Sequence, residues 1–154
     1  MFTIRDAYLR DIETIIDYRM KLLFELGKVE KEEGTSKLRD ATRSYFINKI
    51  QTGEFRVWIA ESAGKIIGMT CIQFIEHPPI YENIGGIEAH VMDVYTTHEW
   101  RGKGVATAIL DKVIAHAKEH NAKRIVLNTI GTDTRIYEKL GFTPIRGAME
   151  LFIE

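Results

Sequence analysis

Residues 101–106, RGKGVA, combine two cations and two glycines at the start of a predicted helix. Glycine destabilises a helix by roughly 1 kcal/mol relative to alanine, so its repeated use here needs a reason. The first N–H groups of a helix have no intrahelical acceptor and lie at the positive end of the helix dipole. Gly102 and Gly104 allow an anion to approach these groups, and Arg101 and Lys103 add positive charge. The stretch therefore predicts a phosphate-binding site.

Two common nucleotide-binding patterns do not fit this stretch. The Walker pattern G-x-x-x-x-G-K-[ST] is absent, which disfavours a nucleoside triphosphatase. The dinucleotide fingerprint G-x-G-x-x-G fails at its last position, Thr107, and the preceding strands alternate as an antiparallel pair rather than as a βαβ unit. What remains is the pattern R-x-x-G-x-A directly after a predicted strand.

This pattern resembles the pyrophosphate loop of the GNAT superfamily, the acyl-CoA-dependent N-acyltransferases, written [RQ]-x-x-G-x-[GA]. The later stretch LNTIGTDTRIYEKLGF, residues 127–142, is similar to a second GNAT signature, in which a strand ends in Asn and a short helix carries Tyr before EKLGF. The motifs lie between Ile87 and Phe142, and the order of elements agrees over nearly the whole chain. The resemblance implies an N-acetyltransferase that uses acetyl-CoA as its co-substrate.

The resemblance also implies where coenzyme A binds. The cofactor is expected in a cleft where the strand ending near Thr96 separates from the strand ending near Asn128. Backbone groups of the first strand would bond the pantetheine arm and stabilise the oxyanion that forms when an amine attacks the thioester. Many GNAT proteins have an Asn seven residues before the tyrosine, where this chain has Ile130, whereas Asn128 lies nine residues before it and matches another version of the motif. Asn128 is interpreted as a cofactor contact or as a cap of the strand end. The implied cofactor-binding residues are Val94, Tyr95, Thr96, Arg101, Gly102, Lys103, Gly104, Val105, Ala106, Thr107 and Asn128.

Tyr137 lies where the family has its general acid. A thiol pKa of about 8.5 is below a phenol pKa of about 10, so proton transfer from tyrosine to the departing thiolate is mildly uphill. Tyr137 would help by hydrogen bonding to the sulfur and by lending a proton that solvent replaces. The alternative is an aromatic packing residue of a short helix.

Three residues of one predicted strand are candidates for the general base. Glu88, thirteen residues before Arg101, aligns with the base of the histone-modifying branch of the superfamily, and Asp93 and His90 are the other ionisable candidates. Simple alternation puts Glu88 and His90 on one face and Asp93 on the other. A β-bulge, which is frequent beside active sites, would exchange the faces beyond it. Deprotonation through water without a single essential base is a further alternative.

The elements that must position these residues follow from hydrophobic spacing and turn residues. Strands are predicted at residues 2–7, 54–62, 65–76, 87–96, 123–129, 142–145 and 148–154, and helices at residues 8–26, 38–50, 105–117 and 133–140. The order β-α-α-β-β-β-α-β-α-β-β predicts an α/β mixed sheet with helices on both faces, the GNAT-like acyl-CoA N-acyltransferase fold. From the resemblance, the acceptor pocket is expected at residues 23–44 and 75–86.

Composition limits the function classes. The 154 residues suit one domain, predicted to be a single N-acetyltransferase domain over residues 1–154. The single cysteine, Cys71, excludes an internal disulfide, and no histidine spacing is typical of a metal site, so no metal is predicted. A net charge of −1 predicts no general attraction for nucleic acid or membrane. A cytoplasmic protein is expected because the N-terminus carries charges where a signal peptide is apolar. A homodimer fits the resemblance.

The leading functional hypothesis is transfer of an acetyl group from acetyl-CoA to a primary amine of a small molecule, by direct attack in a ternary complex. One alternative is an enzyme that acetylates proteins or peptides, which requires an open peptide groove. Another is a non-catalytic acyl-CoA-binding module that retains the phosphate loop without the chemistry.

Overall fold

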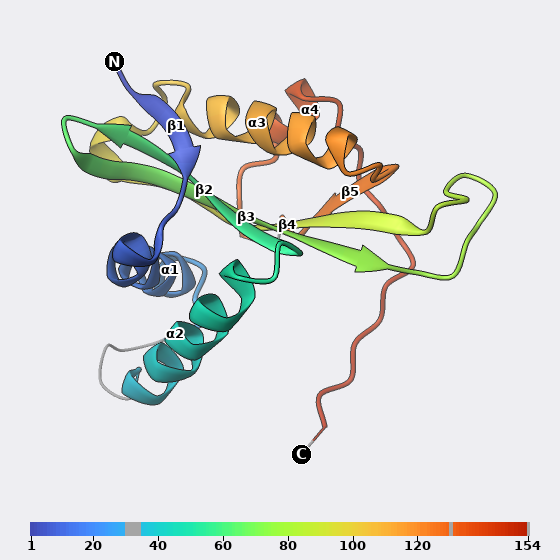
Figure 1. The fold of residues 1–154 in the computed structure, drawn as a ribbon, viewed down its shortest axis with the longest axis horizontal. Coiled ribbons are helices and arrows are strands. Elements are labelled where there is room, and N and C mark those ends of the chain that lie inside the picture. Colours follow the sequence, from blue (N-terminus) through green and yellow to red (C-terminus); the bar gives the residue numbers. More distant parts are fainter. Residues whose placement is uncertain (30–34, 130, 154) are drawn as a thin grey trace.

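The computed structural model describes residues 1–29, 35–129 and 131–153. Its five-stranded sheet has the order β1 (Thr3–Asp6), β2 (Phe55–Ser62), β3 (Lys65–Glu76), β4 (Ile87–Thr96) and β5 (Arg124–Leu127). Strands β1 to β4 pair with one another in antiparallel fashion, and β5 is parallel to β4 (Figure 1). Between β2 and β3, Ala63 and Gly64 have φ values of 49° and 74°, as a two-residue turn with positive φ at both positions requires. The mixed sheet confirms the predicted fold class.

Helices cover both faces of the sheet (Figure 1). One core contains apolar side chains of α1 (Ile12–Glu25) and α2 (Ser36–Ile50), and the other contains those of α3 (Val105–Glu119) and α4 (Arg135–Lys139). Short 3-10 helices at Leu9–Asp11 and His98–Trp100 precede α1 and the turn before α3. Alternating apolar side chains of β2, β3 and β4 supply both cores because successive strand residues point to opposite faces.

A β-bulge interrupts β4. Met69 and Cys71 of β3 are two residues apart, but their partners Tyr95 and Met92 are three apart, so β4 contains an extra residue. Asp93 within this segment has a φ of 56°, in the left-handed region. The carboxylate of Asp93 consequently lies on the α1 side, together with Met92 and Tyr95. Simple alternation is therefore wrong beyond Met92, and the bulge is confirmed.

Strands β4 and β5 pair over a short distance. Residues 88–91 of β4 align with residues 124–127 of β5, and the register between the two strands ends there. Beyond Val91, the edge of β4 that faces β5 has no strand partner in the described part of the chain. The two strands thus separate on the side where each of them ends, as expected for the cofactor cleft.

The two closing strands predicted at residues 142–145 and 148–154 do not form in the described residues. Residues 143–153 contain no strand, and the segment runs away from the body of the protein (Figure 1). Their alternating apolar residues suit a strand, but a strand is stable only against a neighbouring strand. None of the described residues supplies one here, so this part of the prediction is wrong for the isolated chain.

Candidate active site

The space in front of the turn before α3 is not filled by other parts of the protein. Gly102 and Gly104 have φ values of 72° and 79°, and a Cβ at either position would meet nothing within 4 Å. The first hydrogen bond of the helix runs from the Ala108 N–H to the Gly104 carbonyl at 3.0 Å. The N–H groups of Val105, Ala106 and Thr107 precede it and therefore have no intrahelical acceptor. This is the strand–turn–helix arrangement that the phosphate prediction requires.

A glycine in β3 determines how closely α3 approaches the sheet. A Cβ at Gly68 would lie 2.9 Å from Cγ1 of Val105, whose side chain is buried in the core. Any larger residue at position 68 would push the first turn of α3 away from β3. Gly68 could not be identified from the sequence, because the contact joins residues far apart in the chain.

The two cations of the loop have partners within the chain. Arg101 donates from Nε to the Thr96 carbonyl at 2.9 Å, and Nη2 lies 2.9 Å from both carboxylate oxygens of Glu25. Its guanidinium also lies 5.6 Å from the ring centre of Tyr95. Lys103 lies 5.3 Å from the ring centre of Trp100. Arg101 thereby ties the end of β4 to the end of α1, a positioning contact that its motif position alone does not indicate.

A cavity of about 170 Å³ lies where β4 and β5 separate. Four predicted site residues line it, namely Asp93, Val94, Asn128 and Tyr137. The remaining wall is formed by Leu22, Leu23, Leu26, Lys28, Val91, Met92, Leu127 and Thr132. The end of α1 thus contributes to the cavity, through Leu23, Leu26 and Lys28 of the expected acceptor region at residues 23–44. None of residues 75–86 lines this cavity, and the place of the acceptor stays a prediction.

Asp93 is the carboxylate of this cavity. Its side chain is 8% exposed and forms an ion pair with Arg19 of α1. The Cys71 thiol lies 3.9 Å from its Oδ2. Burial raises the pKa of the Asp93 carboxyl, although the Arg19 charge opposes this shift. A carboxylate with a raised pKa is a stronger base than an exposed one.

Tyr137 belongs both to a core and to the cavity wall. It is 6% exposed, and its ring packs edge to face against Phe142 with the ring centres 6.1 Å apart. Burial raises the pKa of its phenol, so the hydroxyl stays protonated at neutral pH. The packing role and the acid role are therefore compatible in one residue.

Beyond Val91, the backbone edge of β4 on the β5 side has no strand partner in the described residues, so its polar groups are available to the cleft. The side chain of Val94 packs in the α3 core, whereas Tyr95 packs against Tyr18 of α1 with the ring centres 5.0 Å apart. The Thr96 carbonyl accepts the bond from Arg101. Asn128, just after β5, lines the cavity from the opposite side, and Ile130 lies outside the described residues.

Glu88 lies outside this cavity, in a cluster with two histidines. His90 Nε2 lies 2.7 Å and His77 Nε2 3.5 Å from Glu88 Oε1, and Arg124 Nη1 donates to Oε2 at 3.2 Å. The ligand atoms of His77, Glu88 and His90 lie within 4.8 Å of one another, a spacing that could hold a metal ion. The Arg124 charge opposes a cation there. The spacing of these residues in the sequence does not reveal the cluster, because only the pairing of β3 with β4 brings His77 to Glu88 and His90.

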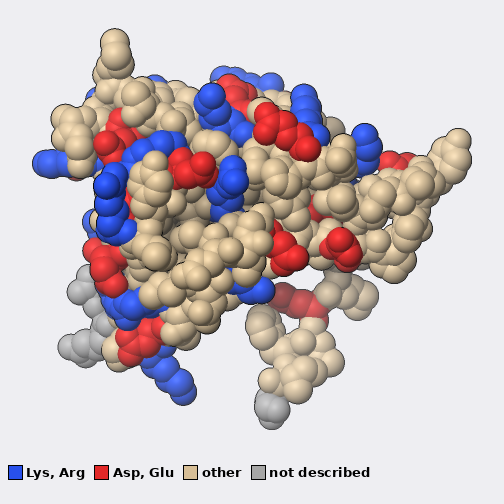
Figure 2. Space-filling model, in the orientation of Figure 1, with Lys and Arg blue, Asp and Glu red and all other residues tan. Residues whose placement is uncertain are grey.

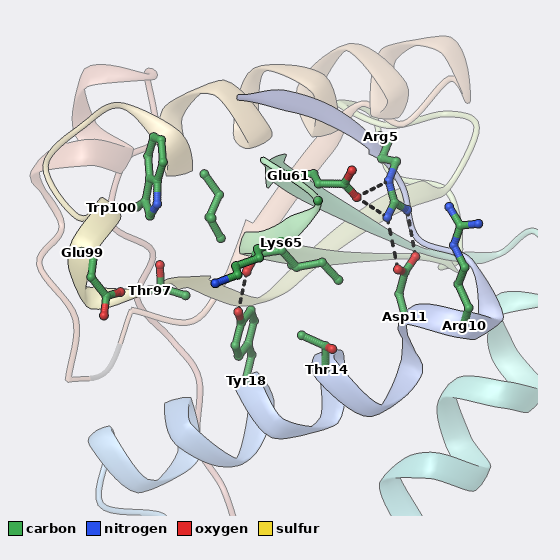
Figure 3. A pocket seen from close by; sticks show the side chains of 13 residues that line it. Arg5, Arg10, Asp11, Thr14, Tyr18, Glu61, Lys65, Thr97, Glu99 and Trp100 are labelled. Carbon is green, nitrogen blue, oxygen red and sulfur yellow. Dashed lines mark hydrogen bonds and ion pairs between the residues drawn. The ribbon is translucent and has the colours of Figure 1, made fainter. Parts of the chain in front are cut away.

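A larger hollow of about 870 Å³ lies between α1, the turn joining β2 and β3, and the 3-10 helix before α3 (Figure 3). Arg5, Asp11, Glu61 and Lys65 are among its lining residues, and none of the predicted site residues is among them. In the orientation of Figure 1, basic and acidic side chains are intermixed over the surface, with no extended patch of one sign (Figure 2). The size of this hollow alone does not connect it to the acetyl-transfer chemistry.

No helix in the described residues is both long and apolar enough to cross a membrane.

Comparison with solved structures identifies similar folds. The crystal structure of a predicted acetyltransferase with acetyl-CoA from Clostridium acetobutylicum matches with a TM-score of 0.88 and 32% identity, covering 99% of this chain and 96% of that one. A GCN5-related N-acetyltransferase from Ralstonia eutropha matches with a TM-score of 0.87 and 18% identity, covering 99% of each chain, which supports the fold alone.

Comparison with curated sequences gives more distant relatives. N-acetyltransferase 8F1 of Mus musculus is 28% identical over 72 residues, which are 47% of this chain and 31% of that protein. The matched region thus spans about a third of the length of that relative. The sequence model of the acetyltransferase (GNAT) family matches residues 20–142, which include the loop before α3 and Tyr137. The chain therefore belongs to the acetyltransferase (GNAT) family.

Proposed function

We propose that this chain transfers the acetyl group of acetyl-CoA to a primary amine of a small molecule, by direct attack within a ternary complex. The observation that carries the proposal is the cavity between the separating strands β4 and β5. Asp93, Asn128 and Tyr137 line this one cavity, although they lie on different elements. A carboxylate and a phenol are thereby both present in the wall of one small cavity.

The proposal assigns the diphosphate of coenzyme A to the turn before α3. The N–H groups of Val105, Ala106 and Thr107 supply donors, and the 15-residue helix α3 supplies a dipole with its positive end at the turn. A Cβ added at Gly102 or Gly104 would meet nothing within 4 Å, so the space in front of the turn is open to an anion. The acetyl-CoA in the Clostridium acetobutylicum structure, at 32% identity, supports the same cofactor here.

In the proposed reaction, the amine nitrogen attacks the thioester carbonyl carbon, forming the C–N bond as the C–S bond breaks. Backbone N–H groups of β4 between Val94 and Thr96 stabilise the oxyanion that develops on the carbonyl oxygen. Tyr137 donates its hydroxyl proton to the departing sulfur and regains a proton from solvent. Burial raises the pKa of the Tyr137 phenol, which keeps the hydroxyl protonated at neutral pH but makes it a weaker acid. Its main contribution is therefore a hydrogen bond to the departing sulfur.

The amine must lose a proton before or during attack. Asp93 is the better placed of the carboxylates considered, because it lines the cavity and burial raises its pKa. Glu88 does not line the cavity, so it could act only through water. The cavity of about 170 Å³ has the size for a small amine or for one extended side chain of a peptide, so the acceptor screen below decides between them.

To test the proposal, the protein is incubated with acetyl-CoA and a panel of monoamines, polyamines, amino acids and peptides. The release of free thiol from coenzyme A is measured for each acceptor. Acetylation of small amines, with both substrates required before any product appears, supports the proposal. Turnover with peptides alone would establish the protein-acetylating alternative. Coenzyme A binding by calorimetry without turnover on any acceptor would identify a non-catalytic binding module.

A further inference from the structure

The cluster of His77, Glu88 and His90 is not used by the proposed acetyl transfer. Nε2 of His90 lies 2.7 Å from Oε1 of Glu88, and Nε2 of His77 lies 3.5 Å from the same oxygen. The two imidazole rings are nearly parallel, with an angle of 25° between their planes and their centres 6.2 Å apart. Two imidazole nitrogens thus meet at one carboxylate oxygen.

The distances in this cluster suit a divalent transition metal. Zinc binds histidine nitrogens and carboxylate oxygens at about 2.0–2.2 Å, and tetrahedral geometry puts such ligand atoms about 3.3 Å from one another. The contacts of 2.7 Å and 3.5 Å with Glu88 Oε1 bracket this value, and all three ligand atoms lie within 4.8 Å of one another. Small rotations of the side chains therefore suffice to bind an ion. Two imidazoles favour zinc over magnesium and calcium, which prefer oxygen ligands.

The pairing of β3 with β4 holds the three ligands on one side of the sheet. Glu88 and His90 are two residues apart in β4, so their side chains share a face. His77 directly follows β3, and its N–H donates to the Gly86 carbonyl at 2.8 Å. A Cβ at Gly86 would lie 2.3 Å from the His77 carbonyl oxygen, so this close approach requires glycine. The backbone that carries the ligands is thus held in place by its own hydrogen bonds.

The charge of Glu88 is available to a metal ion. Its side chain is 10% exposed, and a buried carboxylate is costly unless a cation or hydrogen bonds compensate for the lost water. Arg124 donates to the other oxygen, Oε2, at 3.2 Å and leaves Oε1 to the histidines. The Arg124 side chain is 48% exposed, so water weakens its repulsion of an ion at Oε1. Its hydrogen bond also orients the carboxylate, as partners of metal-binding carboxylates do.

We propose that His77, Glu88 and His90 bind one Zn²⁺ ion, and that the ion fastens the loop between β3 and β4 to the sheet. This loop, residues 77–86, projects from one end of the sheet (Figure 1). His77 is the first residue of the loop, whereas the other two ligands lie within β4. The bound ion thereby cross-links the loop to the strand whose following residues, from Val91 onward, line the cavity between β4 and β5.

Calorimetric titration of the untagged, metal-free protein with ZnCl₂ tests the site. We expect one Zn²⁺ per chain with a Kd of about 10 µM or below. His77→Ala, His90→Ala and Glu88→Gln should each weaken binding at least about tenfold, because each removes a ligand or its charge. Zn²⁺ at about a hundred times its Kd should raise the Tm of the unmodified protein by about 5 °C or more, and that of His77→Ala much less.

Two variants control for binding at other histidines. His98 lies 3.7 Å from Glu25 at an exposed site, so it is a histidine–carboxylate pair without a second histidine. His120 lies beside His116, with the ring centres 4.1 Å apart, so it belongs to a histidine pair without the carboxylate of Glu88. His98→Ala and His120→Ala should both bind Zn²⁺ as tightly as the unmodified protein.

Zn²⁺ binding is measured without acetyl-CoA or an amine, so its result is separate from the test of acetyl transfer. The His77 side chain is 47% exposed, so His77→Ala should fold, and circular dichroism checks this. A Kd above about 10 µM for the unmodified protein would overturn the proposal. So would a loss of less than tenfold in folded His77→Ala, or a tenfold loss in either control.

Discussion

The proposed reaction depends on two buried side chains, Asp93 and Tyr137, and burial shifts the pKa of each. Tyr137 and Asp93 line the same cavity, and burial raises the pKa of each. For the carboxyl this strengthens the base that forms on ionisation, whereas for the phenol it keeps the hydroxyl protonated but weakens it as an acid. The same physical cause thus supports the base role of Asp93 and limits Tyr137 mainly to hydrogen bonding to the sulfur.

Tyr137→Phe removes the hydroxyl and retains the ring that packs against Phe142. We expect kcat to fall by about 100-fold or more, since general acid catalysis contributes roughly 10²–10⁴-fold. The dissociation constant for coenzyme A should change less than about twofold, because the phosphate contacts lie elsewhere. Tyr8→Phe, at a 53% exposed position away from the cavity, is the control. An unchanged kcat in Tyr137→Phe would remove the assigned role.

Asp93→Asn should lower kcat/KM by about 100-fold, the scale of a lost general base. In the unmodified protein, kcat/KM should increase with pH as Asp93 ionises, because the base must be ionised to act. The midpoint of this increase should lie above the ordinary Asp pKa of about 3.9, because burial raises the Asp93 pKa. Asp93→Asn should abolish this increase.

Glu88→Gln provides the comparison for Asp93→Asn, since Glu88 does not line the cavity. Its effect on kcat/KM should be less than about tenfold, well below that of a lost general base. A larger loss in Glu88→Gln than in Asp93→Asn would transfer the base role to Glu88.

At the scale of elements, the site depends on how strands and helix ends meet. The bulge in β4 turns the Asp93 side chain toward α1, and the separation of β4 from β5 opens the cavity. Gly68 lets α3 pack closely on β3, which brings the start of the helix to the end of β4. Each of these features is a local irregularity that a regular sheet would lack.

Gly104→Glu tests the helix start as the diphosphate site. The new side chain meets no protein atom within 4 Å at its Cβ, so the structural cost is the left-handed backbone, about 1–2 kcal/mol. Its carboxylate would repel phosphate at the helix N-terminus. We expect coenzyme A affinity, measured by calorimetry, to fall at least 100-fold.

Gly53→Glu is the matched control for that variant. Gly53 has a φ of 75° and equally open space at its Cβ, but it lies in the turn before β2. It should undergo a similar loss of stability with unchanged coenzyme A affinity. Equal affinity losses in the two variants would show that backbone strain, rather than the phosphate contact, explains the result.

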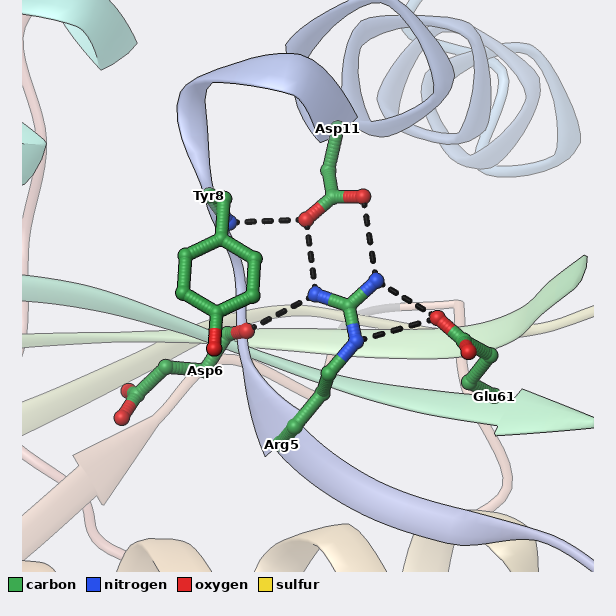
Figure 4. A network of polar contacts seen from close by, with 5 residues as sticks. All are labelled: Arg5, Asp6, Tyr8, Asp11 and Glu61. Atoms are coloured by element: carbon green, nitrogen blue, oxygen red, sulfur yellow. Dashed lines mark hydrogen bonds and ion pairs between the residues drawn. The ribbon is translucent and has the colours of Figure 1, made fainter. Parts of the chain in front are cut away.

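At the scale of the whole molecule, the N-terminal strand is joined to the first helix and to β2 by one arginine (Figure 4). Arg5 donates to both Asp11 oxygens at 2.8 Å and 3.1 Å, to Glu61, and to the Asp6 carbonyl at 3.0 Å. The Asp11 side chain is 8% exposed, and the bond from Arg5 lowers the pKa of its carboxyl. The Arg5–Asp11 part of the network therefore stabilises the fold mainly while Asp11 is ionised.

Asp11→Asn should lower the free energy of unfolding by about 2 kcal/mol at pH 7, less than the loss of a fully buried ion pair. Because the Asp11 pKa is lower in the folded than in the unfolded state, its contribution is present above the unfolded value near 3.8 and is lost as the pH falls through the folded value. Urea unfolding at pH 7, 5 and 3 should show the difference between the two proteins shrinking toward pH 3.

Glu13→Gln is the control for that comparison, because Glu13 pairs with Arg43 at an exposed site. It should change the urea midpoint much less. A difference between unmodified protein and Asp11→Asn that stays constant from pH 7 to pH 3 would contradict the assigned role of Asp11.

Local sequence determined most elements and the candidate phosphate loop. Helical spacing in α1 and α3, alternation in β2 to β4, and glycines at the start of α3 depend on residues near one another in the chain, so the sequence alone predicts them. The same locality identified Tyr137 and Asn128 through their signature. The family that these motifs predicted is confirmed, while the roles of the individual site residues stay predictions.

Features that bring together residues far apart in the chain were determined by the tertiary structure and not by the local sequence. The extra residue of β4, the grouping of Asp93 with Tyr137, and the meeting of His77 with Glu88 each arise from pairing between strands or packing of helices. Alternation likewise predicted strands in the C-terminal tail, yet no described residue of the same chain pairs with them. A β-strand needs an adjacent strand to pair its backbone groups, and the residue pattern of one segment does not show whether such a strand is present.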